Sequence, residues 1–328
     1  MGAIDQETGK LSPITLAGKA TDPSWVTLSP DGKYLYAALE GGAGAVESFQ
    51  VEADGTLKSL NQQPSGGKAT CHLWATGKHV LAANYSGGNI ASFPVEADGS
   101  LGARTQLVQF TGSGPNPKRQ QQSFAHGVIT DKTGKFAYAC DLGSDHVWAF
   151  RFDEKTGELT PTEPAKYAIS PGHGPRHMAI SADDRFLYVD AEMGHTVTVF
   201  ERDLQTGLLT SIQTVSGLPE QGPDDEITTA EIALHPSGKW LYLSHRGDDA
   251  FTVLSVGADG KLTRIETIPS PVNFPRGFAI DPSGRWIVAV GQKDGKLTVL
   301  KIDQETGKLS PTGQIVDAGT PVSVAFAP

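Results

Sequence analysis

Two short motifs that return together about every 45–57 residues constrain this sequence more than any other feature. The first is a turn closed by Gly-Lys or Gly-Arg and followed by an aromatic or apolar strand, as in SPDGKYLYAA (29–38) and HPSGKWLYLS (235–244). The second is an acidic turn that ends in Gly-x-Leu. Its seven glycines are Gly9, Gly55, Gly99, Gly157, Gly207, Gly260 and Gly307. Segments of alternating apolar and polar residues, such as 146–153 and 196–203, follow the first motif and predict further strands.

Each repeat therefore contains four antiparallel strands, which is the content of one β-propeller blade. Seven Gly-x-Leu turns predict an all-β, seven-bladed propeller in which residues 1–328 form one domain. The ten residues IDQETGKLSP at 4–13 recur at 302–311, and TPVSVAF at 320–326 has the pattern of an inner strand. We therefore expect both termini to form the seventh blade. We expect that blade to be incomplete, because its second strand and most of its third have no counterpart here.

The composition fits short strands joined by tight turns and argues against several classes of partner. The 38 glycines and 21 prolines supply backbone conformations that turns require. A net charge of −10 offers no basic surface for nucleic acid or an anionic membrane, and no apolar run is long enough to span a bilayer. The segment MGAIDQETGK lacks the apolar core of a signal peptide. We expect a cytoplasmic monomer in which Cys71 and Cys140 are buried thiols.

Alignment of the repeats reveals a chemically distinctive position where each inner strand begins. Repeat by repeat, that position holds Trp25, His72, His126, His177, Glu231, Gly277 and Ser323. The second strand of a blade runs antiparallel to the first, so its end lies at the same rim. The residues at that end are Glu40, Tyr85, Leu142, Glu192, Arg246 and Gln292. Arg176 and Arg276 stand directly before two of the inner-strand positions.

One mouth of the central channel should therefore collect ionisable side chains from distant segments. They are His72, His126, His177, Glu192, Glu231, Arg176, Arg246 and Arg276. A purely structural interpretation is available, in which these residues bond loop backbone or tie blades together, as Glu192 and Arg246 would. Eight ionisable groups at one rim favour a functional site. Five other histidines lack such neighbours and are predicted at the surface: His79, His146, His173, His195 and His235. For His245 the sequence supports neither assignment.

Longer segments resemble the seven-bladed propeller lactonases in their order and spacing. They include LNQQPSGGKATCHL (60–73), TGSGPNPKRQQQSFAHGV (111–128), GPRHMAIS (174–181), AEIALHPSGKWLYLSHRGDD (230–249) and FPRGFAIDPSGRW (274–286). The resemblance runs through nearly the whole chain from about residue 20. That family includes the propeller form of 6-phosphogluconolactonase and the fungal carboxymuconate cyclase. The resemblance implies the opening of a lactone ring without a redox cofactor, and the expected substrate is the phosphorylated sugar lactone 6-phosphogluconolactone. We expect neither a cofactor nor a metal ion.

The resemblance also implies which residues act. The family's catalytic residues correspond to His126, Arg176, Glu192 and Arg246, and all four belong to the rim predicted from the repeats. The sequence departs from the family pattern beside three of these positions. Those departures are Phe124 where many relatives carry His, and Ala191 and His245 where Asn is usual.

Lactone hydrolysis needs a base that activates water and donors that stabilise the oxyanion. His126 or Glu192 would be the base, and His126 is preferred because an imidazole titrates near neutrality while arginines beside Glu192 disfavour its protonated form. Arg246 or Arg176 would stabilise the oxyanion. The residues expected to bind the substrate are His72, His177, Glu231, Arg276 and Arg119. The arginines among them suit an anionic group.

Three alternatives stay open from the sequence alone. His72, His126, His177 and Glu231 would supply the ligand types of a metal-dependent lactonase. A propeller rim also serves as a binding scaffold without catalysis, because fold does not fix function. Finally, a carboxymuconate-type cyclase running the reaction in the opposite direction would use much the same residues.

Overall fold

The computed structural model describes residues 1–218 and 227–327, and its strands in that part of the chain form six four-stranded antiparallel sheets. The chain divides into two compact units of three sheets each, which are described separately. The N-terminal unit comprises Leu16–Arg176, Asp203–Leu209 and Ala327. The C-terminal unit comprises Met1–Thr15, His177–Arg202 and the described part of Thr210–Phe326. Among the described residues, no helix has the length and apolar character needed to cross a membrane.

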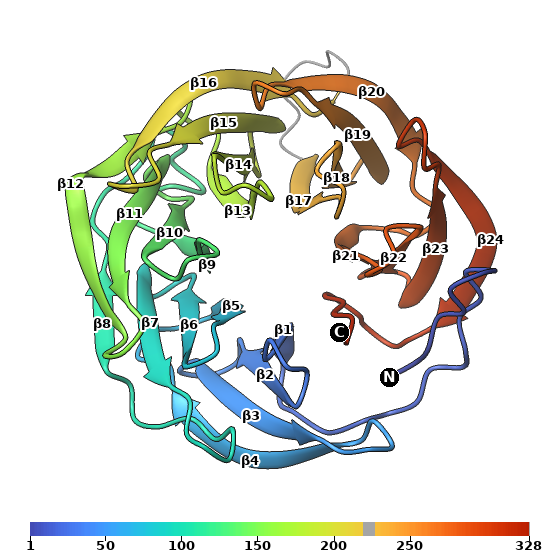
Figure 1. Ribbon diagram of the computed structural model, residues 1–328, viewed down its shortest axis with the longest axis horizontal. Coiled ribbons are helices and arrows are strands. Elements are labelled where there is room, and N and C mark those ends of the chain that lie inside the picture. The colour runs from blue at the N-terminus through green and yellow to red at the C-terminus, as the bar shows by residue number, and fades with distance from the viewer. Residues whose placement is uncertain (219–226, 328) are drawn as a thin grey trace. The chain divides into compact units, whose positions relative to one another are not determined.

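The N-terminal unit holds the first three sheets, labelled in Figure 1. The first consists of β1 (Pro23–Leu28), β2 (Tyr34–Leu39), β3 (Ala45–Val51) and β4 (Leu57–Pro64). The second consists of β5 (Thr70–Ala75), β6 (His79–Asn84), β7 (Asn89–Pro94) and β8 (Gln106–Gln109). The third consists of β9 (Ala125–Thr130), β10 (Phe136–Asp141), β11 (His146–Asp153) and β12 (Glu158–Ala168). In each sheet the strands pair in the order of the sequence, as the repeats predict.

The C-terminal unit holds the other three sheets. The fourth sheet consists of β13 (Pro175–Ile180), β14 (Phe186–Ala191), β15 (Thr196–Arg202) and β16 (Leu209–Ser216). The fifth consists of β17 (Thr228–Leu234), β18 (Trp240–Arg246), β19 (Ala250–Val256) and β20 (Leu262–Pro269). The sixth consists of β21 (Pro275–Ile280), β22 (Trp286–Gly291), β23 (Lys296–Ile302) and β24 (Leu309–Asp317). Four of the inner strands, β1, β5, β13 and β21, have the bounds of the aligned repeat segments 23–28, 70–75, 175–180 and 275–280.

Burial follows the place of each strand in its sheet. The second strands β6, β10, β14, β18 and β22 are buried at every residue. They lie between two paired strands, and both of their faces pack on neighbouring side chains, so continuous apolar runs suit them. The outer strands β12 and β24 are mostly exposed, and over their later residues exposed side chains alternate with half-buried ones, because one face is in water.

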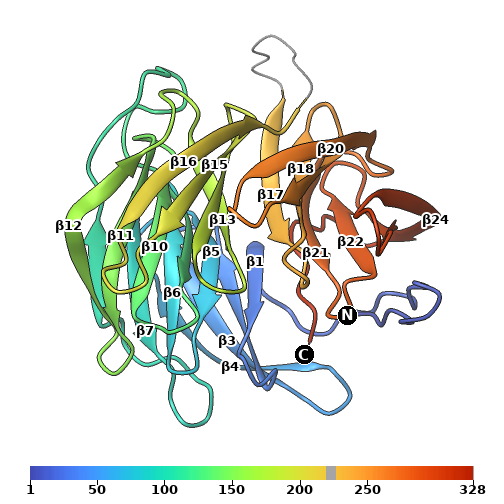
Figure 2. The ribbon, with the colours of Figure 1, turned by 45° about the horizontal axis from the view of Figure 1, so that its top comes forward.

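The core lies between the faces of consecutive sheets. In the N-terminal unit, Ile90 of the second sheet packs with Val128 and Phe150 of the third. In the C-terminal unit, Phe251 of the fifth sheet packs with Ile287 of the sixth. This packing places the inner strands of consecutive sheets beside one another: β1, β5 and β9 in the first unit, and β17 and β21 in the second (Figure 1). Figure 2 shows β1 beside β5, and β17 beside β21, from another side. Residues at the starts of inner strands are thereby brought close within each unit.

The two copies of IDQETGKLSP dock in the same way. Gly307 (φ +74°) lies so close to the Trp240 ring that a Cβ atom would come within 2.4 Å of it. Gly9 (φ +70°) lies equally close to Trp286, at 2.6 Å. Only glycine combines this positive φ with so close an approach. The N-terminal copy therefore packs on the sixth sheet as the other copy packs on the fifth.

A second contact repeats alongside the glycine. The Gln213 side chain accepts a hydrogen bond from the Leu262 N–H (2.7 Å) and donates to its carbonyl oxygen (2.9 Å). Gln314 of β24 likewise accepts from the Leu11 N–H (3.0 Å), and its amide donates to the Gly9 carbonyl oxygen (2.9 Å). The segment 4–13 thus makes contacts of the same kind as the Gly-x-Leu turn that ends at Leu262.

The predicted inner strand at 320–326 is wrong as a strand. Residues 321–327 carry no strand assignment, although Val324 and Phe326 pack on Trp286 together with Ile4 and Leu11. Ile4 and Leu11 form an isolated antiparallel bridge. The apolar residues of this segment thus pack on the sixth sheet, but a strand also needs a neighbouring strand with which to form ladder hydrogen bonds. No seventh sheet occurs in residues 1–218 and 227–327.

Candidate functional site

Irregular pairing marks the start of most inner strands. In the third sheet the register skips His126, since Ala125 pairs with Asp141 and Gly127 pairs with Cys140. The register also shifts between Thr229 and Ile232 in the fifth sheet. The other shifts lie between Pro23 and Trp25, between Thr70 and His72, and between Pro275 and Gly277. A β-bulge of this kind turns a side chain away from the regular ladder direction. The position singled out by the aligned repeats is therefore the position, or the immediate neighbour, of a bulge.

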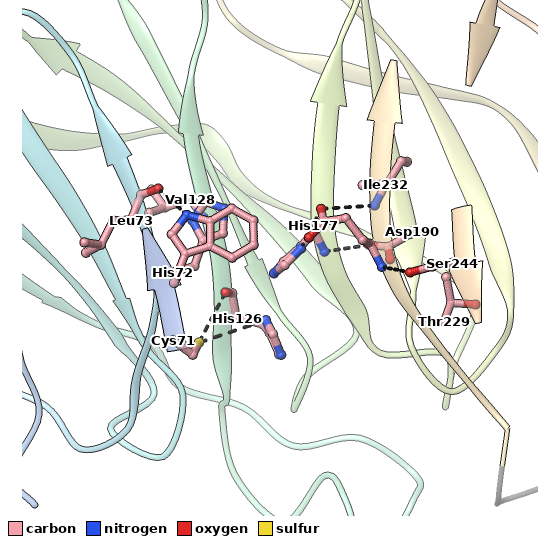
Figure 3. Close-up of polar contacts among 12 residues, drawn as sticks. Cys71, His72, Leu73, His126, Val128, His177, Asp190, Thr229, Ile232 and Ser244 are labelled. Atoms are coloured by element: carbon pink, nitrogen blue, oxygen red, sulfur yellow. Dashed lines mark hydrogen bonds and ion pairs between the residues drawn. The ribbon is translucent and has the colours of Figure 1, made fainter. Parts of the chain in front are cut away.

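In the N-terminal unit, His72 and His126 lie on the adjacent strands β5 and β9, and both are buried. Nδ1 of His72 accepts a hydrogen bond from the Val128 N–H at 3.4 Å, so the second histidine's strand holds the first (Figure 3). The ring of Trp25 lies on His72 with centroids 4.5 Å apart. The His72 ring is therefore held by the backbone of β9 and by an aromatic neighbour.

His126 has a different set of neighbours. The Sγ atom of Cys71 lies 4.0 Å from its Nδ1 and donates to its backbone oxygen at 3.4 Å (Figure 3). The Tyr85 ring meets the imidazole edge-on, with centroids 5.4 Å apart. Phe124 stacks on Tyr85 at 4.8 Å, and Nη2 of Arg119 donates to the Tyr85 hydroxyl at 3.4 Å. The phenol thus joins the predicted binding residue Arg119 to the predicted base.

In the C-terminal unit, two buried acid–base pairs form across neighbouring sheets. Nη2 of Arg246, at the end of β18, lies 3.1 Å from Oε2 of Glu192, which follows β14. Nδ1 of His177 on β13 lies 3.1 Å from Oε1 of Glu231 on β17. The structure therefore brings four of the predicted residues together in two pairs, Glu192 with Arg246 and His177 with Glu231. The tie between blades that the sequence offered as a structural alternative for Glu192 and Arg246 is also present.

The guanidinium of Arg246 is held from several sides. The same Nη2 donates to the Thr229 carbonyl oxygen at 3.3 Å, and the Phe274 ring lies 5.5 Å from the guanidinium carbon. The Thr229 N–H in turn donates to the Glu192 carbonyl oxygen at 2.9 Å. Thr229 therefore contacts both members of the ion pair through its backbone, which fixes the orientation of a group with five potential donors.

The second pair is supported by polar side chains at the ends of second strands. Asp190 accepts a hydrogen bond from the His177 N–H at 2.6 Å. Ser244 accepts from the Glu231 N–H at 3.1 Å, and the Glu231 carboxylate also accepts from the Ile232 N–H at 3.1 Å (Figure 3). Glu231 was expected to bind substrate, and the structure adds that it holds the His177 imidazole.

The remaining predicted residues differ in exposure. Arg176 on β13 is buried, with 2% of its surface exposed. Arg276 on β21 lies within the register shift of the sixth sheet and is half-buried. In the described residues, no three or more His, Cys, Asp or Glu side chains come together in a way that would hold a metal ion. The four residues proposed as ligands of a metal-dependent lactonase are thus not gathered into such a cluster in that part of the chain.

His245, for which the sequence supports neither a surface nor a site assignment, lies inside the fifth sheet. It is fully buried, and burial lowers its pKa to about 3, with the neighbouring His195 imidazole adding to the shift. Its Nδ1 lies 3.0 Å from the Thr229 hydroxyl and its Nε2 lies 3.1 Å from the Thr252 hydroxyl. The surface prediction is wrong for His79 and His235, which are buried under aromatic neighbours. Burial lowers the pKa of both imidazoles.

Sequence reasoning did not assign Tyr85, Thr229 or Phe274 to the site. Tyr85 stands in the column of second-strand ends. The sequence pattern does not mark an aromatic residue there as a contact of His126. Thr229 acts through its backbone, which no side-chain pattern reports. Phe274 adopts a positive φ of 60°, held by the Asp249 carboxylate at its N–H (2.8 Å), and loop strain of this kind leaves no signal in a single sequence.

A matching family model, two similar proteins and a similar solved structure are all named as lactonases. The family model described as Lactonase, 7-bladed beta-propeller matches residues 2–326. The 6-phosphogluconolactonase of Bacillus subtilis is 32% identical over 98% of this chain and 92% of the relative. That of Serratia proteamaculans is 32% identical over 87% of this chain and 82% of the relative. The solved periplasmic gluconolactonase of Pseudomonas aeruginosa is 28% identical, with a TM-score of 0.92 over 100% of this chain and 94% of that one.

Proposed function

Because the chain belongs to the seven-bladed β-propeller lactonase family, we propose that it hydrolyses a sugar lactone, with 6-phosphogluconolactone opened to 6-phosphogluconate as the first candidate reaction. Members of this family are all-β propellers with four-stranded antiparallel blades, in keeping with the six sheets of the described residues. The observation that carries the proposal is the buried pair of Glu192 and Arg246 (3.1 Å), since both residues correspond to catalytic positions of the family.

In the proposed reaction a water oxygen bonds to the lactone carbonyl carbon while a base takes the water proton. The ring C–O bond then breaks, and the leaving oxygen receives the proton. We assign the base to His126, because the Glu192 carboxylate is engaged in orienting the Arg246 guanidinium. Arg246 stabilises the oxyanion, together with Arg176. That His126 and Arg246 act on one substrate rests on the aligned sequence repeats and on the family resemblance.

The substrate preference follows from the cationic groups. Arg119 and Arg276 would bind the anionic group, because a guanidinium matches phosphate or carboxylate oxygens with two parallel donors. His72, His177 and Glu231 would contact the sugar hydroxyls. With two of the named relatives being 6-phosphogluconolactonases, a phosphorylated lactone is preferred over a plain sugar lactone.

The test compares two buried arginines of the C-terminal unit. Arg202 pairs with Asp184 (3.6 Å) before the start of β14, whereas Glu192 follows the end of that strand. Hydrolysis of 6-phosphogluconolactone is followed by oxidation of the product with a coupling dehydrogenase. Arg246→Lys should lower kcat by about 10²-fold, the usual cost of an oxyanion donor, while Arg202→Lys should leave it near the wild-type value.

Three results would count against the proposal. Wild-type turnover no faster than spontaneous hydrolysis would remove the lactonase assignment. Equal losses in the Arg246 and Arg202 variants would show that the pair with Glu192 is only a structural tie. Loss of activity after chelation would contradict the metal-free chemistry, under which a chelator leaves the rate unchanged.

We also infer that residues 4–13 and 321–326 are parts of a seventh blade, and that the chain is a single domain. Support comes from Gly9, which docks on Trp286, and from Gln314, which binds Leu11 as Gln213 binds Leu262. The family description gives seven blades. The cytoplasmic location and the monomeric state stay predictions.

A further inference from the structure

A chain of polar contacts crosses all four strands of the fifth sheet. It begins at the Thr229 hydroxyl on β17, passes through both nitrogens of His245 on β18 (3.0 and 3.1 Å), and reaches the Thr252 hydroxyl on β19. The Thr252 hydroxyl lies 2.9 Å from that of Thr267 on β20. Each contact is within hydrogen-bond distance. The His245 imidazole joins β17 to β19, because each of its two ring nitrogens contacts a hydroxyl on a different strand.

The position of this chain links it to the site. Thr229 is the residue whose carbonyl oxygen accepts from Arg246 and whose N–H donates to the Glu192 carbonyl oxygen. Its hydroxyl is held by the Nδ1 atom of His245, the residue that directly precedes Arg246. We propose that His245 is a positioning residue: by fixing Thr229 from the interior of the sheet, it sets the geometry of the Arg246–Glu192 pair.

The environment of the imidazole suits this role. His245 has no exposed surface, and burial keeps its pKa far below its usual value, so the ring is neutral near pH 7. A neutral imidazole donates from one nitrogen and accepts at the other, which gives the chain of hydroxyls a consistent direction. Buried polar chains of this kind hold their members firmly when every bond is made, and they lose that rigidity when one link is removed.

The neighbouring fourth sheet supplies a matched comparison. There Thr198 on β15 lies 3.4 Å from Thr214 on β16, hydroxyl to hydroxyl. Thr198 pairs with Val189 of β14 as Thr252 pairs with Leu243 of β18. The two threonine pairs are thus alike in their place within the sheet, and only the second is joined to a histidine. Thr198→Val therefore removes the same type of bond without touching the His245 chain.

The experiment measures kcat and KM for 6-phosphogluconolactone in four variants. His245→Leu should lower kcat roughly tenfold with a smaller change in KM, because the oxyanion donor loses its orientation while substrate contacts stay. His245→Asn keeps a polar atom near Thr229 and should restore most of kcat. Thr252→Val should lower kcat by a few-fold, and Thr198→Val should match the wild type.

A crystal structure of Thr252→Val and of His245→Leu gives a readout that does not depend on turnover. The inference rests on the proposed lactonase activity for its kinetic arm only. If the wild type hydrolyses no lactone, the proposed function fails, and the structures still decide the inference. An Arg246 guanidinium displaced by more than about 0.5 Å supports it. An undisplaced guanidinium, or equal kcat in Thr252→Val and Thr198→Val, overturns it.

Discussion

The neutral, buried His245 predicts a measurable loss of stability in mild acid. Its pKa is about 3 in the folded protein, against roughly 6.5 in an unfolded chain. Below about pH 6.5 the unfolded chain therefore binds a proton that the folded protein excludes until about pH 3. Because the folded pKa is the lower one, the stabilising contribution is complete above about pH 6.5 and is lost as the pH falls toward 3. Between about pH 8 and pH 5 this one group should remove roughly 2 kcal/mol from the free energy of unfolding.

The assay is urea unfolding followed by tryptophan fluorescence at both pH values, for the wild type and for His245→Asn. Other titrating groups contribute equally to both proteins, so the difference between their pH dependences isolates the imidazole. His245→Asn should lose roughly 2 kcal/mol less than the wild type between the two pH values. Thr252→Val, which keeps the imidazole and breaks the next contact, should retain the wild-type dependence. If the wild type and His245→Asn lose the same free energy, the ring is charged or hydrated in the folded state, and the argument from burial is refuted.

Three further outcomes are expected. Gln314→Ala should speed amide exchange at Leu11 by roughly two- to tenfold in hydrogen-exchange mass spectrometry, because the bond from that N–H (3.0 Å) is lost; unchanged exchange would show that the segment 4–13 is held by other contacts. Phe124→Ala should lower the free energy of unfolding by at least about 1 kcal/mol in urea titrations, since the stack on Tyr85 (4.8 Å) disappears; an unaltered midpoint would contradict this. Both cysteine thiols are buried, so Ellman's reagent should modify them only after denaturant is added, and rapid labelling of Cys71 in the native protein would show that its site opens.

The repeats were enough to predict the order of the strands within each sheet. Inner strands such as β13 were predicted to the residue, because alternation and turn chemistry are local properties. The column containing His126 and Glu231 could also be read from the sequence, since aligned repeats occupy equivalent places. The pairing within the site was harder to read, because the partner of each acid depends on bulges and side-chain rotamers. That Glu231 contacts His177 required the structure.

Two errors have a common physical origin. The segment 321–326 has a strand pattern, yet strand formation depends on a pairing partner as well as on propensity. His79 begins β6 and His235 directly follows β17, and residues beside turns are usually exposed, but the aromatic side chains of Phe152 and Trp240 cover these two. In both cases the outcome depended on what lies next to the segment in space.

The β-bulges at the starts of the inner strands place candidate site residues outside the regular ladder of hydrogen bonds. A side chain at a bulge lies outside the regular ladder, so strand pairing itself does not depend on which residue stands at position 126 or 231. The cost of a substitution falls on the buried contacts instead, because exchanging Glu231 removes the acidic contact of the buried His177 imidazole. Altered reactivity at these positions is therefore best sought by changing contacting residues together, which keeps both the ladder and the buried polar contacts.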